Sequence, residues 1–453
     1  MSIKVKYQYT HFIYPFVIDN KQYIDFIKYI LSQQKDWKLK INEYKNDTYL
    51  YNFYLPYMRK FLFPILFWQG DFKKEFKTLS LNKKASILSK LSCATFEYKL
   101  SNIKLGKLEN EYGLNINYDI SKIDLICFEP GICFLDIKAQ IEDESEMIDI
   151  SKVQDFNHYF RKLTPRIENN YELMAQKLKN SKSANRIIAL IDSITSKFEK
   201  NNFDRIYYDK MFTYTYVCVD GWKNVQDFEK MKNDFLKLQY VAGSHSTEIF
   251  NCECSKIKDN MYSRWEYSTF GFSRESGIVF VSDKEKYNIT RMPYNFEKTY
   301  LYMLLLAFYQ RISLINFSQD LLEEDKTKAR ALKKRFTKFT NMSWFSQITN
   351  SEHGMDIWEK WQNAFGLREL FDEVRKEYIE YYDFAMASGQ ERINVLLILL
   401  YTISIVFTGL QVLVGYFDIS SLENYIIAIM LIAVFSYPLY VLIWWITHKL
   451  KIK

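Results

Sequence analysis

The stretch that decides the fold is INVLLILLYTISIVFTGLQVLVGYF, residues 393–417. It contains no charged side chain, and as a helix it is long enough to cross the hydrocarbon core of a bilayer. Within it, small and polar residues recur at alternating steps of three and four, which places them on one helical face. That face consists of Asn394, Leu397, Tyr401, Ser404, Thr408, Gln411 and Gly415.

The polar stripe on this helix has two interpretations. Polar groups cost free energy against lipid tails, so they turn toward partner helices or a water-filled lumen, while the intervening leucines and valines suit lipid. We interpret the stripe as the wall of a pore. Small polar residues at this spacing also serve as ordinary contacts in a closed helix bundle, and that alternative stays open.

A second uncharged stretch, residues 425–447, is also long enough to span a bilayer. The connection 418–424 contains no Lys or Arg, whereas Arg392 precedes the first span and three lysines follow the second. By the positive-inside rule, both ends of this hairpin lie in the cytoplasm. Residues 1–30 contain no sustained apolar run typical of a signal sequence, so the N-terminal region is expected to stay in the cytosol.

The connection between the two spans carries Asp418 and Glu423, which then face outward. Repeated around an oligomer, these carboxylates would form an acidic ring that raises the local concentration of cations. The same residues would also suit a simple soluble turn between two spans. The sequence does not separate these two interpretations.

Residues 1–290 alternate helical patterns with short β-like runs and predict a cytosolic α/β domain, which we interpret as the ligand-sensing part of the chain. The runs 123–128 and 132–138 flank a Glu129-Pro130-Gly131 turn and indicate a β-hairpin. Further strands are predicted at 214–219 and 277–281, and a helix at 151–163.

Residues 291–392 have a helical pattern throughout and predict a stalk that leads to the membrane region, residues 393–453. The apolar segment 300–309 is too short to cross a membrane and is expected to be a buried core helix. The last stalk helix begins near Leu367 and has no strong breaker before the first span. Projected backward, the polar stripe meets acidic positions that would line a cytosolic vestibule and favour cations: Glu373, Glu380 and Asp383.

Composition argues against several other classes of function. A net charge of +7 over 453 residues is modest and gives little support to direct binding of nucleic acid. Six cysteines fit reduced thiols in a cytosolic protein, and no Cys or His pairs have zinc-site spacing. The chain has no phosphate-binding glycine loop, no His-Glu-x-x-His pair and no Gly-x-Ser-x-Gly elbow. We therefore expect a protein that is not an enzyme and has no covalent cofactor. The sequence leaves open whether it binds a metal ion.

The order of these elements resembles the CorA family of magnesium channels. The shared features are a large cytosolic α/β domain, a long helix entering the membrane, a short acidic outer loop, a second span and a basic tail. The resemblance implies a homopentamer embedded in membrane lipids, with the first span of each subunit lining the pore. One departure concerns the Tyr-Gly-Met-Asn signature that ends the first span in this family. Here Val414-Gly415-Tyr416-Phe417 stands in its place, so only the glycine of the magnesium filter remains.

The chain is similar in particular to divergent CorA-like effectors of type III CRISPR systems. The segments that carry this similarity are WEYSTFGFS (265–273), YQRISL (309–314) and WFSQITN (344–350). The resemblance implies an antiviral protein of the inner, cytoplasmic membrane of a prokaryote. It also implies a nucleotide messenger, an adduct of S-adenosylmethionine and AMP, that opens the pore and damages the membrane.

Arginines and aromatic residues of the α/β domain are candidate contacts for such a messenger. Arginine forms charge-assisted hydrogen bonds with phosphate, and an exposed aromatic ring stacks on adenine. The candidates are Arg161, Arg166, Arg264, Trp265, Phe272 and Arg274. Surface salt bridging or core packing is the alternative for each of them.

Two other functions remain open from the sequence. The chain could be a constitutive transporter of magnesium or another divalent cation, closed by the ion it carries, because carboxylates such as Glu373, Glu380 and Asp383 suit hard cations. It could also be a membrane-anchored binding module with no conductance. Rescue of a magnesium-uptake mutant would favour the first of these.

Overall fold

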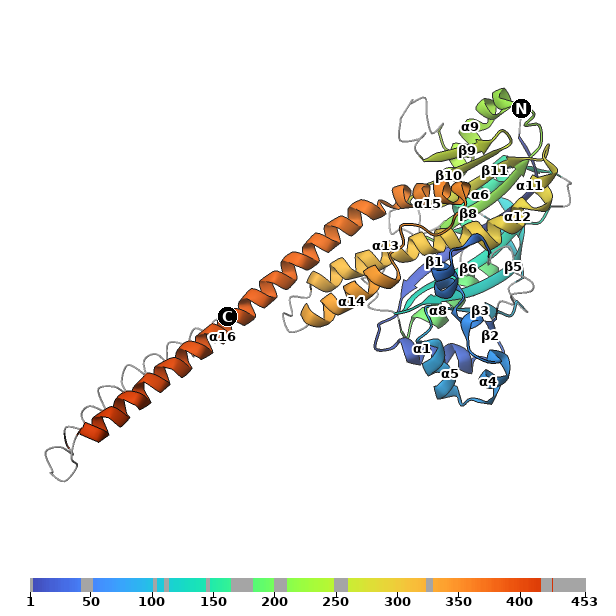
Figure 1. Ribbon diagram of the computed structural model, residues 1–453. Coiled ribbons are helices and arrows are strands. Elements are labelled where there is room, and N and C mark those ends of the chain that lie inside the picture. Colours follow the sequence, from blue (N-terminus) through green and yellow to red (C-terminus); the bar gives the residue numbers. More distant parts are fainter. Residues whose placement is uncertain are drawn as a thin grey trace, which may run out of the picture. The chain divides into compact units, whose positions relative to one another are not determined.

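The structure is a computed structural model (Figure 1). It describes residues 3–41, 52–100, 104–109, 114–143, 147–163, 182–198, 210–247, 260–322, 329–416 and 426. The candidate ligand contact Arg166, the outer-loop residues Asp418 and Glu423, and nearly all of the predicted second span lie outside these residues. The predicted two-helix hairpin therefore stays a prediction.

A mixed β-sheet forms the centre of the N-terminal region, which confirms the predicted α/β class. The strand order is β2-β3-β5-β6-β1-β8-β11-β10-β9, with β4 beside β5 and β7 beside β1. β8 and β11 pair in parallel, and the other described pairs are antiparallel. The strands are β1 (Lys4–Val17), β2 (Trp37–Lys40), β3 (Cys93–Tyr98), β4 (Leu105–Glu109), β5 (Asn115–Phe128), β6 (Ile132–Ile141), β7 (Ile148–Asp149), β8 (Phe212–Val219), β9 (Met261–Trp265), β10 (Ser268–Phe272) and β11 (Ser276–Ser282).

Several predicted elements are confirmed at close to their expected bounds. The hairpin about Glu129-Pro130-Gly131 is β5 and β6, paired from Tyr118↔Ile141 to Phe128↔Ile132. Gly131 has a φ of 120°, a backbone conformation that suits glycine at this turn. The strands predicted at 214–219 and 277–281 are β8 and β11, and the helix predicted at 151–163 is α6 (Ile150–Phe160). The long strand β1, which lies between β6 and β8, was not predicted.

The helices are labelled in Figure 1, and their bounds are as follows. They are α1 (Tyr23–Ser32), α3 (Pro56–Leu62), the 3-10 helix η1 (Pro64–Phe67), α4 (Phe72–Thr78), α5 (Leu81–Leu88), α6, α8 (Lys182–Thr195), α9 (Val225–Gln239), α11 (Lys286–Thr290), α12 (Met292–Asn295), the π-helical turn η2 (Phe296–Tyr300), α13 (Leu301–Leu322), α14 (Ala329–Met342), α15 (Glu352–Phe365) and α16 (Leu367–Tyr416).

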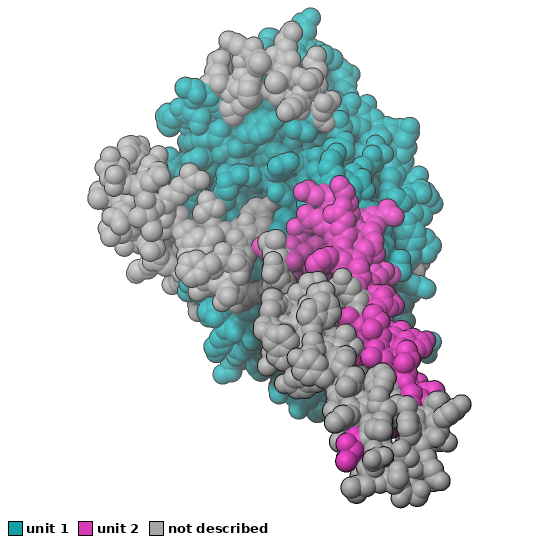
Figure 2. Space-filling model, turned by 90° about the vertical axis from the view of Figure 1, so that its left-hand side faces the viewer, with its two compact units in different colours: residues 1–317, 338–372 teal, residues 318–337, 373–453 magenta. Residues whose placement is uncertain are grey.

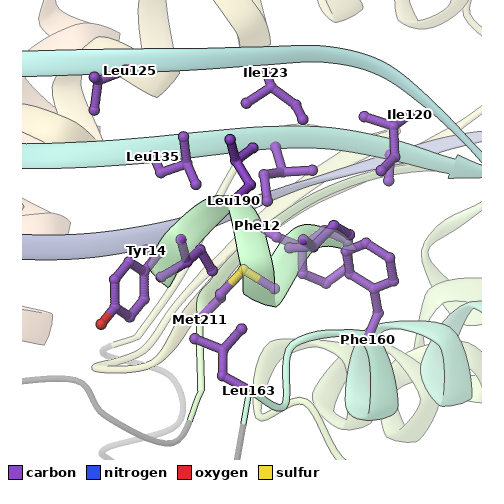
Figure 3. Close-up of a cluster of buried hydrophobic side chains, with 14 of the residues drawn as sticks. Phe12, Tyr14, Ile120, Ile123, Leu125, Leu135, Phe160, Leu163, Leu190 and Met211 are labelled. Atoms are coloured by element: carbon purple, nitrogen blue, oxygen red, sulfur yellow. The ribbon is translucent and has the colours of Figure 1, made fainter. Parts of the chain in front are cut away.

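Side chains along each strand point alternately to the two faces of the sheet, and both faces are apolar. One face packs against helices that include α6 and α8, where Phe12 of β1 lies 4.4 Å from Phe160 between ring centroids. Figure 3 shows this cluster, in which strand residues such as Ile123 and Leu135 meet Leu190 of α8. The other face packs against η2, α13 and α15, where the rings of Tyr214 and Phe296 stack at 4.2 Å.

The apolar segment 300–309 is a buried core helix, as predicted. Every side chain from Tyr300 to Tyr309 is buried, because this segment, the last residue of η2 and the start of α13, lies against the sheet. By length and composition, Met292–Leu321 is the one helix among the described residues that could cross a membrane, and most of it is buried. Ile393–Gly409 is a shorter apolar helical stretch. We therefore assign residues 292–317 of this helix to the core of the α/β region.

The chain divides into two compact units, coloured separately in Figure 2. The first comprises residues 1–317 and 338–372, and the second 318–337 and 373–453. The sequence boundary near residue 290 therefore falls inside the first unit. The reason is that η2, most of α13 and α15 bury their apolar side chains against the sheet instead of standing apart as a stalk.

The second unit is built on α16. This helix runs without a break from Leu367 to Tyr416 over 50 residues, a length of about 75 Å at the rise of an α-helix. The expected start near Leu367 is confirmed. Within this unit, Phe336 of α14 stacks on Tyr378 at 4.5 Å between ring centroids. Asp320 near the end of α13 pairs with Arg335 at 3.0 Å.

Candidate functional sites

The structure divides the predicted messenger contacts into separate places. Arg161 and Arg274 lie near the turn between β10 and β11, at one end of β10. Arg264 and Trp265 lie at the far end of β9, which pairs with the other end of β10. Phe272 is 1% exposed and packs edge-on against Trp361 at 4.9 Å, so it is a core residue and not a stacking platform. These residues therefore do not form one pocket.

The first group centres on Glu275. Its carboxylate accepts a hydrogen bond from Arg161 Nη2 at 3.1 Å and another from Lys210 Nζ at 2.7 Å, each on a different oxygen. Burial alone would raise the pKa of Glu275, but Lys210 and Arg161 outweigh it and lower this pKa. Lys210 comes just before β8 and was not among the sequence candidates, because no local pattern connects it to Arg161.

The second group is an aromatic and ionic cluster. Trp265 is 48% exposed and meets His353 of α15 edge-on at 4.4 Å. His353 lies between two phenol oxygens, with Nε2 2.9 Å from Tyr300 Oη and Nδ1 3.1 Å from Tyr262 Oη. Arg264 lies over the Trp265 ring at 6.0 Å and pairs with Glu352 at 2.8 Å.

The titration of His353 in this cluster is shifted by its surroundings. Burial, and after it the positive charge of Arg264, lowers the pKa of His353 from 6.5 to about 4, while Asp356 opposes the shift. The ring is therefore neutral at pH 7. The neutral ring bonds to Tyr262 and Tyr300 through its two nitrogens and contacts the exposed Trp265 ring at its edge.

A third group of charged residues is buried between the sheet and η2. His11 Nδ1 of β1 lies 2.8 Å from Asp136 Oδ1 of β6, and both side chains are 0% exposed. Lys122 Nζ of β5 lies 3.2 Å from Asp124 Oδ2 and 3.9 Å from Asp136 Oδ2. The cluster also contains Lys40, 2.8 Å from Asp124, and the pair formed by Lys138 and Glu297 of η2.

Asp136 and Lys122 of this cluster each favour the ionised form of the other. Burial would raise the pKa of Asp136, but His11 and Lys122 lower it overall. Burial would lower the pKa of Lys122, but Asp124 and Asp136 outweigh this effect and raise it. His11 Nε2 and Asp124 Oδ1 are buried and have no hydrogen-bond partner among the described residues. The arrangement is a buried ion-pair network that fixes η2 to the sheet.

Sequence reasoning missed this network, although a partial signal was present. Lys122 and Asp124 on β5, and Asp136 and Lys138 on β6, alternate with apolar residues, which places charges on one face of otherwise buried strands. No group of three or more His, Cys, Asp or Glu side chains that could hold a metal ion occurs in the part of the chain that the structure describes.

The predicted pore stripe lies on α16. Leu397 and Tyr401 are 44% and 68% exposed, and Asn394, Ser404, Thr408 and Gln411 are exposed as well. Gly415 lies in the last turn of the helix. The apolar residues between them are equally uncovered, with Leu400 at 61% and Ile405 at 71%. In the described chain, both faces of this stretch are therefore open.

The predicted vestibule positions lie farther back on α16. Glu373, Glu380 and Asp383 are all exposed, and Glu380 lies 3.8 Å from Lys376 of the same helix. On the opposite side, Val374 and Tyr378 are buried. In this part of the helix, the acidic positions therefore lie on the exposed side and the two apolar residues on the buried side.

No family model, curated protein or solved structure matches the chain.

Proposed function

We propose that the chain is a CorA-like homo-oligomeric membrane channel, a pentamer by the resemblance, that acts as an antiviral effector of a type III CRISPR system. A nucleotide messenger, the adduct of S-adenosylmethionine and AMP, binds the cytosolic α/β unit and opens the pore, and ion flow then disrupts the inner membrane. No enzymatic step and no covalent cofactor is involved. Both termini lie in the cytoplasm, and two spans cross the membrane.

One observation carries this proposal: a single helix, α16, is charged over its first half and free of charge from Ile393 onward. Large apolar side chains such as Leu396, Leu400 and Phe407 are 58–66% exposed on it. Exposed apolar surface in water costs about 25 cal/mol per Å². A helix that is apolar on most of its circumference suits lipid or partner helices.

The polar stripe supports an oligomer around a lumen. Ser404 and Thr408 lie on the same face as Tyr401 and Gln411, among residues that suit lipid. Thr408 Oγ1 donates to the Ser404 carbonyl of its own helix, but lipid offers no partner to the polar groups of Tyr401, Ser404 and Gln411. Their favoured neighbours are the same face of other subunits and the water between them. The acidic Glu380 and Asp383 on the preceding turns would attract cations toward such a pore.

Gating requires that the messenger bind the open arrangement more tightly than the closed one. The ion-pair groups around Glu275 and Trp265 are two places in the described part of the first unit where an arginine lies at or next to accessible surface. They support the assignment of messenger binding to this unit.

The test is single-channel conductance of the purified full chain in planar bilayers. The adduct and magnesium are titrated separately on the cytosolic side. Opening by micromolar adduct is the expected result. Current that responds to magnesium alone would support the divalent-cation transporter instead. A protein that inserts into the membrane but carries no current would support the binding module.

A further inference from the structure

We propose that Arg161 and Lys210 form a phosphate-binding site, with the carboxylate of Glu275 as an internal anion that a phosphoryl group displaces. The ligand class is a phosphate ester. This inference rests on the proposed function and deepens it, because it says where the phosphate of the messenger binds.

The geometry around Glu275 matches what a phosphate needs. Two cations of different kinds each contact a separate oxygen of one carboxylate, at 3.1 Å from Arg161 and 2.7 Å from Lys210. A phosphoryl group offers the same pair of oxygens and a third one, with more negative charge. Charge-assisted bonds from arginine and lysine to phosphate are stronger than neutral ones.

The backbone that carries the two cations is fixed by pairing. An isolated β-bridge sets Lys162 opposite Lys210, and the amide of Met211 donates to the carbonyl of Arg161 at 2.8 Å. The Lys162 ammonium lies 2.9 Å from His158 Nε2. Glu275 is the carboxylate that meets both Arg161 and Lys210.

The cations and the anion differ in how firmly they are held. The side chain of Arg161 is 10% exposed and that of Lys210 is 25% exposed, whereas that of Glu275 is 46% exposed. The backbone of the turn is fixed separately, because Ser273 Oγ accepts hydrogen bonds from the amides of Glu275 at 3.3 Å and Ser276 at 2.9 Å. The carboxylate can therefore swing into solvent while the turn and the two cations stay in place.

The experiment measures binding and needs no membrane current. AMP and uncharged adenosine are titrated by calorimetry into the full chain in detergent micelles. AMP is expected to bind and adenosine is not. Glu275→Gln, which removes the competing charge, is expected to raise AMP affinity about tenfold, the equivalent of one charge-assisted contact. The double variant Arg161→Gln/Lys210→Met is expected to lower it at least as much.

A matched control is Asp283→Asn, which removes the carboxylate from another lysine pair of the same unit, with Lys6 at 3.1 Å. It is expected to leave AMP affinity unchanged. The site is overturned if Glu275→Gln binds AMP no better than the wild-type chain, if adenosine binds as well as AMP, or if Asp283→Asn changes affinity as much as Glu275→Gln.

Loss of Glu275 leaves two cations without their counterion, so folding is checked in the same series. Inorganic phosphate is expected to raise the Tm of Glu275→Gln more than that of the wild-type chain, and equal shifts would count against the site. The proposal fails separately from the channel. If AMP binds but the protein conducts no current, the phosphate site is supported and the pore is rejected. If the adduct opens a current that Arg161→Gln/Lys210→Met does not alter, the pore is supported and the phosphate site is rejected.

Discussion

Asp124 and Asp136 lie directly opposite each other on β5 and β6, and both are buried. Facing carboxylates repel strongly away from water, and the cation between them is Lys122, with Nζ 3.2 Å from one and 3.9 Å from the other. Lys122 is thus the residue that contacts both carboxylates, while Lys40 contacts Asp124 and His11 contacts Asp136.

Replacing Lys122 by Met is expected to lower the free energy of unfolding by about 3 kcal/mol, because it leaves buried charges without their partner. Urea denaturation of the full chain, followed by near-UV circular dichroism, measures the change. Lys152→Met is the control, since its pair with Asp143 lies at the surface and such pairs contribute at most about 1 kcal/mol. Equal losses in the two variants would contradict this account of the network.

The protonation of His353 predicts a pH dependence of stability. Its pKa of about 4 in the folded chain lies below the ordinary 6.5. Between these values the unfolded chain binds the proton and the folded chain does not, so the free energy of unfolding falls as the pH is lowered through this window. Urea midpoints at pH 7 and pH 5 test this. In His353→Asn, the difference between the urea midpoints at pH 7 and pH 5 is expected to be smaller than in the wild-type chain. An unchanged difference would show that another group is responsible.

The pore interpretation predicts that two similar threonines of α16 behave differently. Thr408 Oγ1 donates to the carbonyl of Ser404 at 2.8 Å, and Thr402 Oγ1 donates to that of Ile398 at 2.7 Å. Only Thr408 is on the polar stripe. Thr408→Leu is expected to reduce single-channel conductance at least tenfold by narrowing and drying the lumen, while Thr402→Leu is expected to conduct normally. Equal effects of the two substitutions would favour simple helix packing.

Gly277 of β11 is predicted to be irreplaceable for a steric reason. A Cβ added there would lie 2.5 Å from Trp361 Cη2 and 2.8 Å from Tyr214 Cδ2, and both rings are buried. Gly277→Ala is expected to cost about 2 kcal/mol by overpacking. Thermal unfolding measures this loss. In a Trp361→Phe background, Gly277→Ala is expected to lower stability less, because the Trp361 ring atom that the new Cβ would meet is absent. An unchanged loss of stability would rule out this clash.

The strands and helices with strong local patterns could be predicted from the sequence. The hairpin 123–138 combines apolar β-branched runs with a Pro-Gly turn, and 300–309 is apolar on every side, so both were identified correctly. β1 was missed because polar residues such as Gln8 and His11 interrupt its apolar pattern, although both are buried in the sheet.

The candidate sites were harder to predict because they depend on pairing between distant segments. His11 meets Asp136 across 125 residues and Lys138 meets Glu297 across 159. Arg161 and Glu275 are 114 residues apart. Arg264 and Arg274, in contrast, are close in sequence but are separated by the length of β10. Spacing along the chain therefore grouped residues that the fold separates, and it left out Lys210 and Glu275.

The position of β1 in the sheet also determines how long this strand waits for its partner β8 during biosynthesis. Thr10 of β1 meets Thr215 of β8 across 205 residues, which a ribosome adds in roughly 10–40 s. Throughout this time one edge of an apolar strand has no partner and is open to aggregation or to a chaperone. The uncharged stretch of α16 is made later still, after the last strand of the sheet. A ribosome therefore completes the strands of the sheet before it makes the stretch that we propose to span the membrane.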